Sequence, residues 1–132
     1  MHTERFDVRS GTHSQMIEIT DRVADVVRKA KLANGLVTVY VPHTTAGVTI
    51  NENADPSVAH DVLAALDRSV PWRQDFYQHD EGNSAAHVKA SMMGFSVSIP
   101  VVDGRMTLGT WQAVYFCEFD GPRTRSVIVV CS

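Results

Sequence analysis

Histidines, carboxylates and amides gather in residues 42–61, a short region whose side chains could bind a metal ion or transfer protons. His43 lies in this region, and His79 and His87 follow further along the chain. Neutral imidazole is the commonest metal ligand, and three imidazoles leave one position on the metal open for water or substrate. We therefore expect His43, His79 and His87 to bind a divalent metal, zinc or magnesium. Each histidine taken alone is more readily explained as a structural or surface residue, so the prediction rests on the set.

Glu52 is the carboxylate that we expect to transfer protons or to bind magnesium, because it follows an apolar stretch and lies between two asparagines. Its neighbour Asn51 would orient it or bind substrate. The alternative is a turn rich in Asn and Asp ahead of a helix that Asp55 caps. His60 remains a reserve ligand, since the sequence does not fix the helix face on which it lies. Asp61 either orients an imidazole or lies on a solvated helix face.

Three further side chains complete the predicted catalytic set. Residues 109–112 break the strand pattern with Gly, Thr, Trp and Gln in succession, and a glycine within a strand often marks a bulge or a close backbone approach. We expect Trp111 to form the floor of a pocket for a planar ligand, with Gln112 beside it; a core tryptophan is the alternative. Arg123 follows Gly-Pro on a turn and suits a phosphate or a carboxylate, unless it is a plain exposed hairpin residue.

The elements that position these residues follow from the spacing of apolar side chains. This spacing predicts one helix from residue 20 to about 31, a second after an Asp-Pro cap at 55–56, and a third from residue 83 or 84 to about 93. Residues 71–82 have no period and are typical of an ordered functional loop. The second helix would bury a stripe made of Val58, Val62, Leu63 and Leu66. Strand patterns cover residues 3–9, 15–19, 36–41, 46–50, 95–101, 105–108, 110–119 and 125–130, the first two as a hairpin.

This order predicts a single α+β domain over residues 1–132, with about three helices on one side of a mostly antiparallel or mixed sheet. The net charge of −3 and the lack of a basic run argue against nucleic acid as a partner. No apolar run approaches the roughly 20 residues needed to cross a bilayer, so we expect no membrane partner. The N-terminal residues lack the apolar region of a signal peptide, and Cys117 and Cys131 are not spaced as metal ligands. We therefore expect a cytoplasmic protein with both thiols reduced.

Several stretches of the chain resemble the YjbQ-like family, small proteins often described as secondary thiamine-phosphate synthases. The most specific is Leu-Gly-Thr-Trp-Gln at residues 108–112. The others are His-Thr-Thr-Ala at 43–46, Asn-Glu-Asn at 51–53 with Asp-Pro at 55–56, His-Asp at 60–61 and at 79–80, His-Val-Lys at 87–89 and Gly-Pro-Arg-Thr-Arg at 121–125. The resemblance spans nearly the whole chain. It implies an α+β fold, a homotrimer, and a histidine-rich, metal-binding site near a subunit boundary.

The activity that the resemblance implies is the joining of a pyrimidine methyl diphosphate to a thiazole phosphate, with release of pyrophosphate. The leaving pyrophosphate needs its charge stabilised by a divalent metal or an arginine, which the histidines, Glu52 and Arg123 would supply. The chain has no Gly-rich phosphate loop, and it contains few lysines. Two alternatives therefore stay open: another metal-dependent hydrolase or lyase acting on a phosphorylated small molecule, and a non-catalytic trimeric metal-binding protein.

Overall fold

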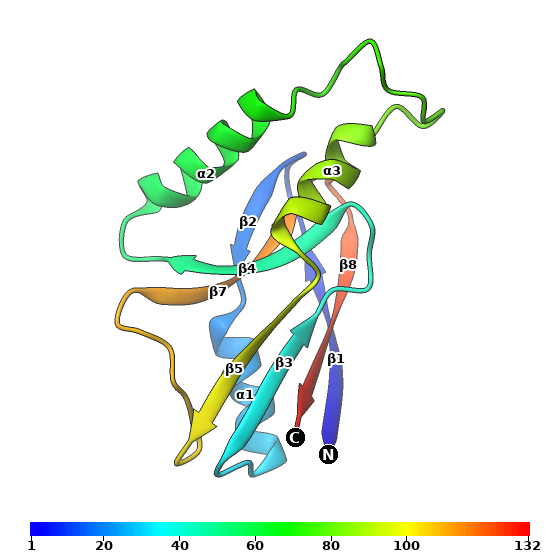
Figure 1. The fold of residues 1–132 in the computed structure, drawn as a ribbon. Coiled ribbons are helices and arrows are strands. Elements are labelled where there is room, and N and C mark those ends of the chain that lie inside the picture. Colours follow the sequence, from blue (N-terminus) through cyan, green and yellow to red (C-terminus); the bar gives the residue numbers. More distant parts are fainter.

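The computed structural model describes all 132 residues, which fold into eight strands and three helices (Figure 1). Every strand pair is antiparallel, so the predicted α+β class and the predicted order of elements are confirmed. In chain order the elements are β1 (His2–Arg9), β2 (Gln15–Glu18), α1 (Thr20–Ala30), β3 (Gly35–Tyr40), β4 (Ala46–Glu52), α2 (Pro56–Ser69), α3 (Ser84–Met93), β5 (Ser96–Val102), β6 (Arg105–Met106), β7 (Gln112–Glu118) and β8 (Thr124–Cys131).

The strands form two sheets instead of one. The larger sheet has the strand order β1-β8-β3-β5-β6, and the smaller one has the order β2-β7-β4. The predicted hairpin of the first two strands is wrong, because β1 pairs with β8 and β2 pairs with β7. The pairing of β1 with β8 runs from His2↔Cys131 to Arg9↔Thr124 over the full length of both strands. The four-residue β2 could satisfy only half of β1 in a hairpin.

The main core lies between the inner face of the larger sheet on one side and α1 with the smaller sheet on the other. Helix α1 contributes Val23, Val26 and Val27, whose spacing places them on one face. Burying each such side chain stabilises the fold by about 1.5–3 kcal/mol. The strands and the residues next to them add Val8, Ile19, Val37, Val39, Val41, Ala46, Val48, Ile99, Val101, Val114, Phe116, Val127, Val129 and Cys131.

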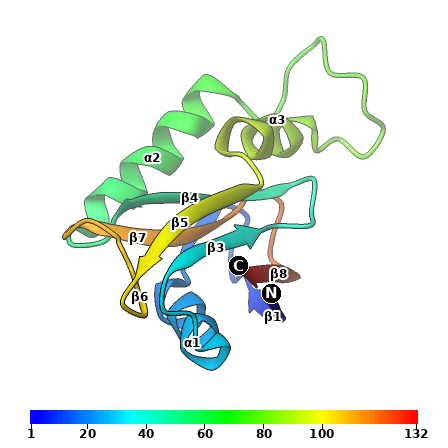
Figure 2. The same cartoon turned by 60° about the horizontal axis from the view of Figure 1, so that its bottom comes forward.

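A second, smaller core covers the opposite face of the three-stranded sheet. In β7, Val114 and Phe116 point into the main core, while Tyr115 and Cys117 point into the second one. Helices α2 and α3 cover this second face, and α1 lies on the other side of β4 and β7 (Figure 2). The prediction that all helices share one side of the sheet is therefore wrong. The reason is that β7 is apolar on both faces, so each face needs its own cover.

Helix α2 is only loosely attached to the rest of the chain. Asp55 caps it as predicted, since its side chain accepts a hydrogen bond of 2.9 Å from the backbone N–H of Ser57. No residue of the helix is fully buried, and the stripe predicted to be buried, Val58, Val62, Leu63 and Leu66, is half-buried. None of the three helices combines the length and the apolar character needed to span a bilayer.

Candidate functional site

A polar pocket of about 450 Å³ opens where the end of β3, the start of β4, the start of α3 and the start of β8 meet. Its lining contains all three histidines predicted as metal ligands, together with the predicted Arg123. The sequence spreads these four residues over 81 positions, and the fold brings them to one place. The polar pocket is lined by Pro42, His43, Thr44, Thr45, His79, Glu81, Asn83, His87, Arg123 and Arg125.

His79 and His87 form the pair of imidazoles on the α3 side of the polar pocket. Their ring centroids lie 5.3 Å apart, and the rings meet edge to face. His87 lies in the first turn of α3, whereas His79 comes from the preceding loop. The Glu81 carboxylate lies 3.8 Å from His79 Nε2. Two imidazoles and a carboxylate therefore gather within nine residues of chain.

His43 lies on the opposite, β3 side of the polar pocket and is held by the backbone. Strand β3 stops pairing with β8 after Tyr40, and Pro42 has no N–H for the ladder. The side chain of His43 replaces the missing strand partner, because its Nε2 accepts a hydrogen bond of 2.8 Å from the backbone N–H of Ser126. Burial and the nearby Arg125 guanidinium lower the pKa of His43 below its ordinary value, so the neutral ring is favoured.

Arg123 is oriented by Asp120, a residue for which the sequence predicted no role in the site. Arg123 Nε donates to the Asp120 carbonyl at 2.8 Å, and its Nη2 donates to Asp120 Oδ2 at 3.1 Å. The same carboxylate oxygen accepts from Asn83 Nδ2 at 2.9 Å. Asp120 therefore ties the start of α3 to the turn before β8, and it fixes the direction of two side chains of the polar pocket.

Beneath the polar pocket lies a buried ion pair, Glu118 with Arg125. Arg125 donates to both carboxylate oxygens of Glu118, through Nε at 2.9 Å and through Nη2. Arg125 Nη2 also donates to Thr45 Oγ1 at 2.8 Å, and Ser10 Oγ donates to Glu118 Oε1 at 2.8 Å. Burial acts to raise the pKa of Glu118, but these hydrogen bonds and that of the Asp120 N–H outweigh it, so the pKa lies below its ordinary value.

Sequence reasoning also missed Glu118 and Arg125 as members of the site. Apart from the place of Arg125 in the Gly-Pro-Arg-Thr-Arg stretch, the signal was their position, since each occupies an inward-pointing place in a strand whose other inward residues are apolar. A charged residue at such a place is rarely buried without a partner. The identity of that partner depends on the pairing of β7 and β8 with their neighbours, which the sequence does not reveal.

The remaining predicted catalytic residues, Asn51, Glu52, Trp111 and Gln112, form a separate group that we call the β4–β7 cluster. Glu52 is the register partner of Gln112 at the far end of β4, whereas Ala46 begins that strand beside the polar pocket. Six residues of extended chain place the two ends about 20 Å apart. Within one chain, the β4–β7 cluster therefore does not contact the polar pocket.

The β4–β7 cluster is open to solvent. Trp111 is 62% exposed, so neither a pocket floor nor the alternative of a core tryptophan describes it within a single chain. Gln112 Oε1 accepts from the Gly109 N–H at 2.8 Å, and the Tyr115 hydroxyl donates to the Glu52 carbonyl at 3.0 Å. The reserve ligand His60 lies elsewhere, on α2, where it is exposed and bonds Asp61 at 3.0 Å.

The fit of a metal to these residues is partial. No group of three or more His, Cys, Asp or Glu side chains in the chain has the placement that would hold a metal ion. His79 and His87 could supply two ligands, and the Glu81 carboxylate lies near His79. Asn83 adds an unpartnered carbonyl, since its Oδ1 is buried without a hydrogen bond while its Nδ2 is held by Asp120. This combination of nitrogen and oxygen donors suits a divalent ion.

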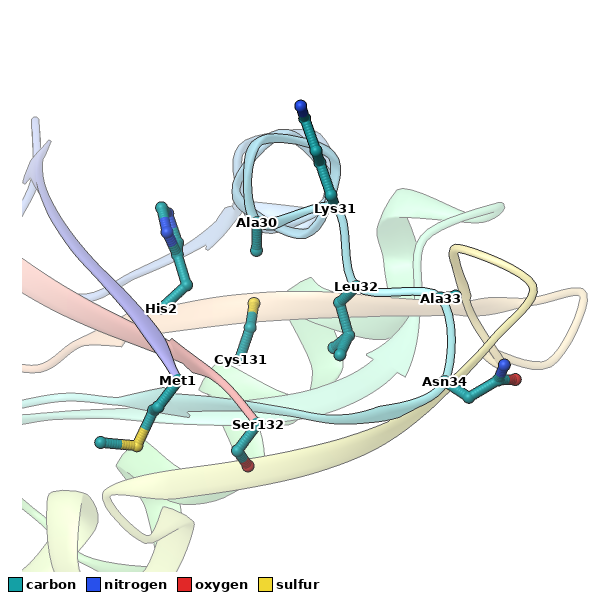
Figure 3. Close-up of a pocket in the computed structure, with 9 residues that line it drawn as sticks. All are labelled: Met1, His2, Ala30, Lys31, Leu32, Ala33, Asn34, Cys131 and Ser132. Atoms are coloured by element: carbon teal, nitrogen blue, oxygen red, sulfur yellow. The ribbon is translucent and has the colours of Figure 1, made fainter.

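A second hollow, of about 620 Å³, lies between the chain termini and the end of α1. Figure 3 shows its lining residues, with the Lys31 side chain extending away from the other labelled side chains. His2 is bonded to Glu4 at 2.8 Å, and the neighbouring Cys131 thiol is buried with a raised pKa. This hollow contains one histidine and one buried thiol, whereas the polar pocket brings together three histidines, two arginines and a carboxylate. The polar pocket is therefore the candidate functional site.

Comparisons with known proteins agree on the fold and the family. The family model described as UPF0047 protein YjbQ-like matches residues 4–132. The UPF0047 protein YugU of Bacillus subtilis is 47% identical over 92% of this chain and 92% of its own length. The UPF0047 protein MJ1081 of Methanocaldococcus jannaschii is 44% identical over 95% of this chain and 90% of its own.

Solved structures match equally well. A YjbQ/UPF0047 family protein from Clostridium acetobutylicum superimposes with a TM-score of 0.96 at 47% identity, covering 98% of this chain and 99% of that one. The hypothetical protein APE1520 from Aeropyrum pernix gives a TM-score of 0.94 at 36% identity, covering 100% of this chain and 98% of that one. The two sheets and three helices described above are therefore shared with these proteins.

Proposed function

The chain belongs to the UPF0047 YjbQ-like family, and we propose that it is a metal-assisted enzyme that acts on a phosphorylated small molecule in the polar pocket. The named reaction is of the secondary thiamine-phosphate synthase type, in which a pyrimidine methyl diphosphate is joined to a thiazole phosphate and pyrophosphate leaves. The observation that carries the proposal is the edge-to-face pair of His79 and His87, 5.3 Å apart, in a pocket that also holds Arg123.

In this proposal, His79 and His87 hold the divalent metal, with Glu81 and the unpartnered Asn83 carbonyl as further donors. A bound divalent metal would stabilise the negative charge that develops on the leaving pyrophosphate. Arg123 binds a phosphate oxygen, because Asp120 orients its guanidinium and leaves Nη1 without a partner in the chain. The groups are in place before the reaction begins, which is what electrostatic catalysis requires.

The charge balance of the polar pocket supports a role for a metal. Arg125 is neutralised by Glu118, and Arg123 is partly neutralised by Asp120. Glu81 adds one more negative charge at the pocket rim. A diphosphate therefore meets little net positive charge from the chain itself. A divalent ion at His79 and His87 would supply the missing charge.

Enzyme assays test this proposal directly. Purified protein is supplied with the pyrimidine methyl diphosphate and the thiazole phosphate, and pyrophosphate release is followed with and without a chelator. We expect release that depends on both substrates and on the metal. Full activity in metal-free protein would remove the metal from the mechanism. Release of phosphate or carboxylate from other substrates, without a thiazole partner, would favour the hydrolase or lyase alternative.

We further propose that the chain assembles as a homotrimer through the outer face of the larger sheet. No helix covers this face, and Leu36 and Tyr40 on β3 are each 46% exposed there. Charged residues are depleted at the centres of protein interfaces, and none is found among the outward residues of the three central strands. These outward residues are Leu36, Thr38, Tyr40, Ser96, Ser98, Pro100, Val102, Thr124, Ser126, Ile128 and Val130.

The proposed setting is the cytoplasm. Cys117 and Cys131 are both free and buried, and burial raises the pKa of the Cys117 thiol to about 12. A thiol of this kind reacts slowly and fits a protein that keeps its cysteines reduced. The β4–β7 cluster, which includes Glu52 and Trp111, joins the proposed active site only if a neighbouring chain brings it there.

A further inference from the structure

We propose that His43 is a neutral hydrogen-bond donor that receives an anionic phosphoryl oxygen of the ligand through its Nδ1–H, and that it is not a metal ligand. This assignment rests on the proposed function only in taking the polar pocket as the place where a phosphorylated ligand binds. It divides the pocket into two sides with different chemistry. The α3 side, with His79 and His87, would bind the metal, and the β3 side would bind the phosphoryl group.

The tautomer of His43 follows from its backbone partner. The N–H of Ser126 can only donate, and it lies 2.8 Å from His43 Nε2, so this nitrogen presents a lone pair. A neutral imidazole carries one proton, which must then lie on Nδ1. Turning the ring over would place a carbon against the Ser126 N–H and leave this partly buried donor unpaired, which is unfavourable.

The architecture explains why the ring is held in this way. In the ladder between β3 and β8, Tyr40 pairs with Ile128, so the same register two residues further on would set Pro42 against Ser126. The pairing with β8 ends at Tyr40, because Pro42 has no N–H to donate, while the Val41 N–H points to the β5 side and donates to the Phe95 carbonyl at 2.8 Å. His43 thus replaces the missing strand partner of Ser126. Its Nε2 has a structural task and is not available to a metal.

The other nitrogen of His43 is open to a ligand. Nδ1 makes no hydrogen bond within the chain, and Asn83 Oδ1 is the only buried side-chain nitrogen or oxygen atom that lacks a partner. Nδ1 is therefore accessible, and the side chain that carries it lines the polar pocket. A metal at Nδ1 would require the ring to lose its one proton or to give up the bond to Ser126, and both are unfavourable next to a backbone donor.

The surroundings favour an anionic oxygen as the acceptor. Arg123 lines the same pocket with its guanidinium held by Asp120, and Thr44 lies beside His43 in the lining. Burial and Arg125 keep the imidazole neutral. A neutral donor held by Ser126 needs no reorientation when the ligand arrives, so it suits a phosphoryl oxygen that gains charge during the reaction.

Nitrogen NMR of the histidine rings tests the tautomer without any activity assay. In full-length protein labelled with ¹⁵N, we expect His43 to show a protonated Nδ1 and an unprotonated Nε2, both before and after zinc is added. Adding inorganic pyrophosphate should shift the Nδ1 signal of His43. An Nε2–H tautomer, or loss of the Nδ1 proton when zinc binds, would overturn the proposal whether or not the protein turns over a substrate.

A pair of variants tests the role by pyrophosphate binding to metal-free protein. His43→Asn keeps an N–H donor close to the place of Nδ1, and we expect its affinity to stay within about threefold of the wild type. His43→Leu removes the donor, and a loss of about tenfold is expected for one hydrogen bond to a charged group. Equal affinity in the leucine variant would refute the proposal. If that variant does not fold, the NMR measurement on the wild type still decides. Pyrophosphate binding without turnover would contradict the proposed reaction and leave this assignment intact.

Discussion

Glu118 and Arg125 form an ion pair that is almost completely shielded from solvent, directly beneath the polar pocket. The Glu118 side chain is 0% exposed and that of Arg125 is 4% exposed. Every oxygen of the carboxylate has a donor, from Arg125, Ser10 or the Asp120 N–H. The pair joins β7 of the smaller sheet to β8 of the larger one, so it links the two sheets next to the polar pocket.

Replacing Glu118 with Gln should destabilise the protein strongly. The change leaves the Arg125 charge buried without a counter-charge, and breaking a buried pair in this way costs about 3–5 kcal/mol. The free energy of unfolding in urea measures the effect. Glu81→Gln is the matched control, since its carboxylate lies on the exposed rim and its loss should change stability by less than about 0.5 kcal/mol. Equal stability of the two variants would show that the pair does not anchor the sheets.

The Glu118 carboxylate should also make the stability of the fold depend on pH. The pKa of Glu118 is lowered from its ordinary value of 4.5 in the folded protein. A lowered pKa means that the folded state favours the ionised form, so this stabilisation is fully present above pH 4.5. It is lost as the pH falls through the lower, folded-state value. The free energy of unfolding should therefore fall more steeply below pH 4.5 in the wild type than in Glu118→Gln. Parallel curves would contradict this.

The attachment of α2 should depend on one ion pair. The Lys89 Nζ lies 3.0 Å from Asp67 Oδ1, and its side chain is buried on α3 while Asp67 on α2 is mostly exposed. Because solvent screens this pair on the Asp67 side, we expect Asp67→Asn to cost about 1 kcal/mol, with a smaller effect at high salt. Asp61→Asn is the control, since Asp61 is equally exposed and bonds only the exposed His60. A salt-independent loss, or the same loss in the control, would argue against the pair.

The outer face of the larger sheet should control assembly. Light scattering should give a mass of three times the 14.5 kDa of one chain. Tyr40→Lys places a charge at the centre of the uncharged face and should yield monomers, since burying an unpaired charge is unfavourable. Thr3→Lys is the control, because it lies on the edge strand β1, beside the charged residues Arg5 and Asp7. A monomeric wild type would contradict the trimer, and a trimeric Tyr40→Lys would contradict this interface.

Much of the fold could be predicted from local sequence patterns. Helix α1 ends near its predicted C-terminus, Asp55 caps α2, and α3 has its predicted boundaries. These features could be predicted because they depend on residues that are close together in the sequence. Strand partners could not be predicted in this way. The first two strands looked like a hairpin, yet each pairs with a strand about a hundred residues away. Long-range register is decided by the whole set of apolar faces, and short windows do not contain it.

The candidate site, too, could be predicted only in part from the sequence. The sequence pointed to His43, His79, His87 and Arg123, and the structure brings all four into one pocket. It also pointed to Glu52 and its neighbours, which lie at the opposite end of β4. Residue type identifies groups that are capable of chemistry, but strand direction decides where they meet. The groups that orient them, such as Asp120, are found only when the fold is known.

The central claim is that His79 and His87 form the metal-binding side of an active site, and metal content tests it most directly. Protein reconstituted with zinc and dialysed should hold about one metal per chain. We expect His79→Ala and His87→Ala to lose it, while His60→Ala, with its exposed imidazole on α2, keeps it. A wild type that holds no zinc, or a His87→Ala variant that holds as much as the wild type, would contradict the account.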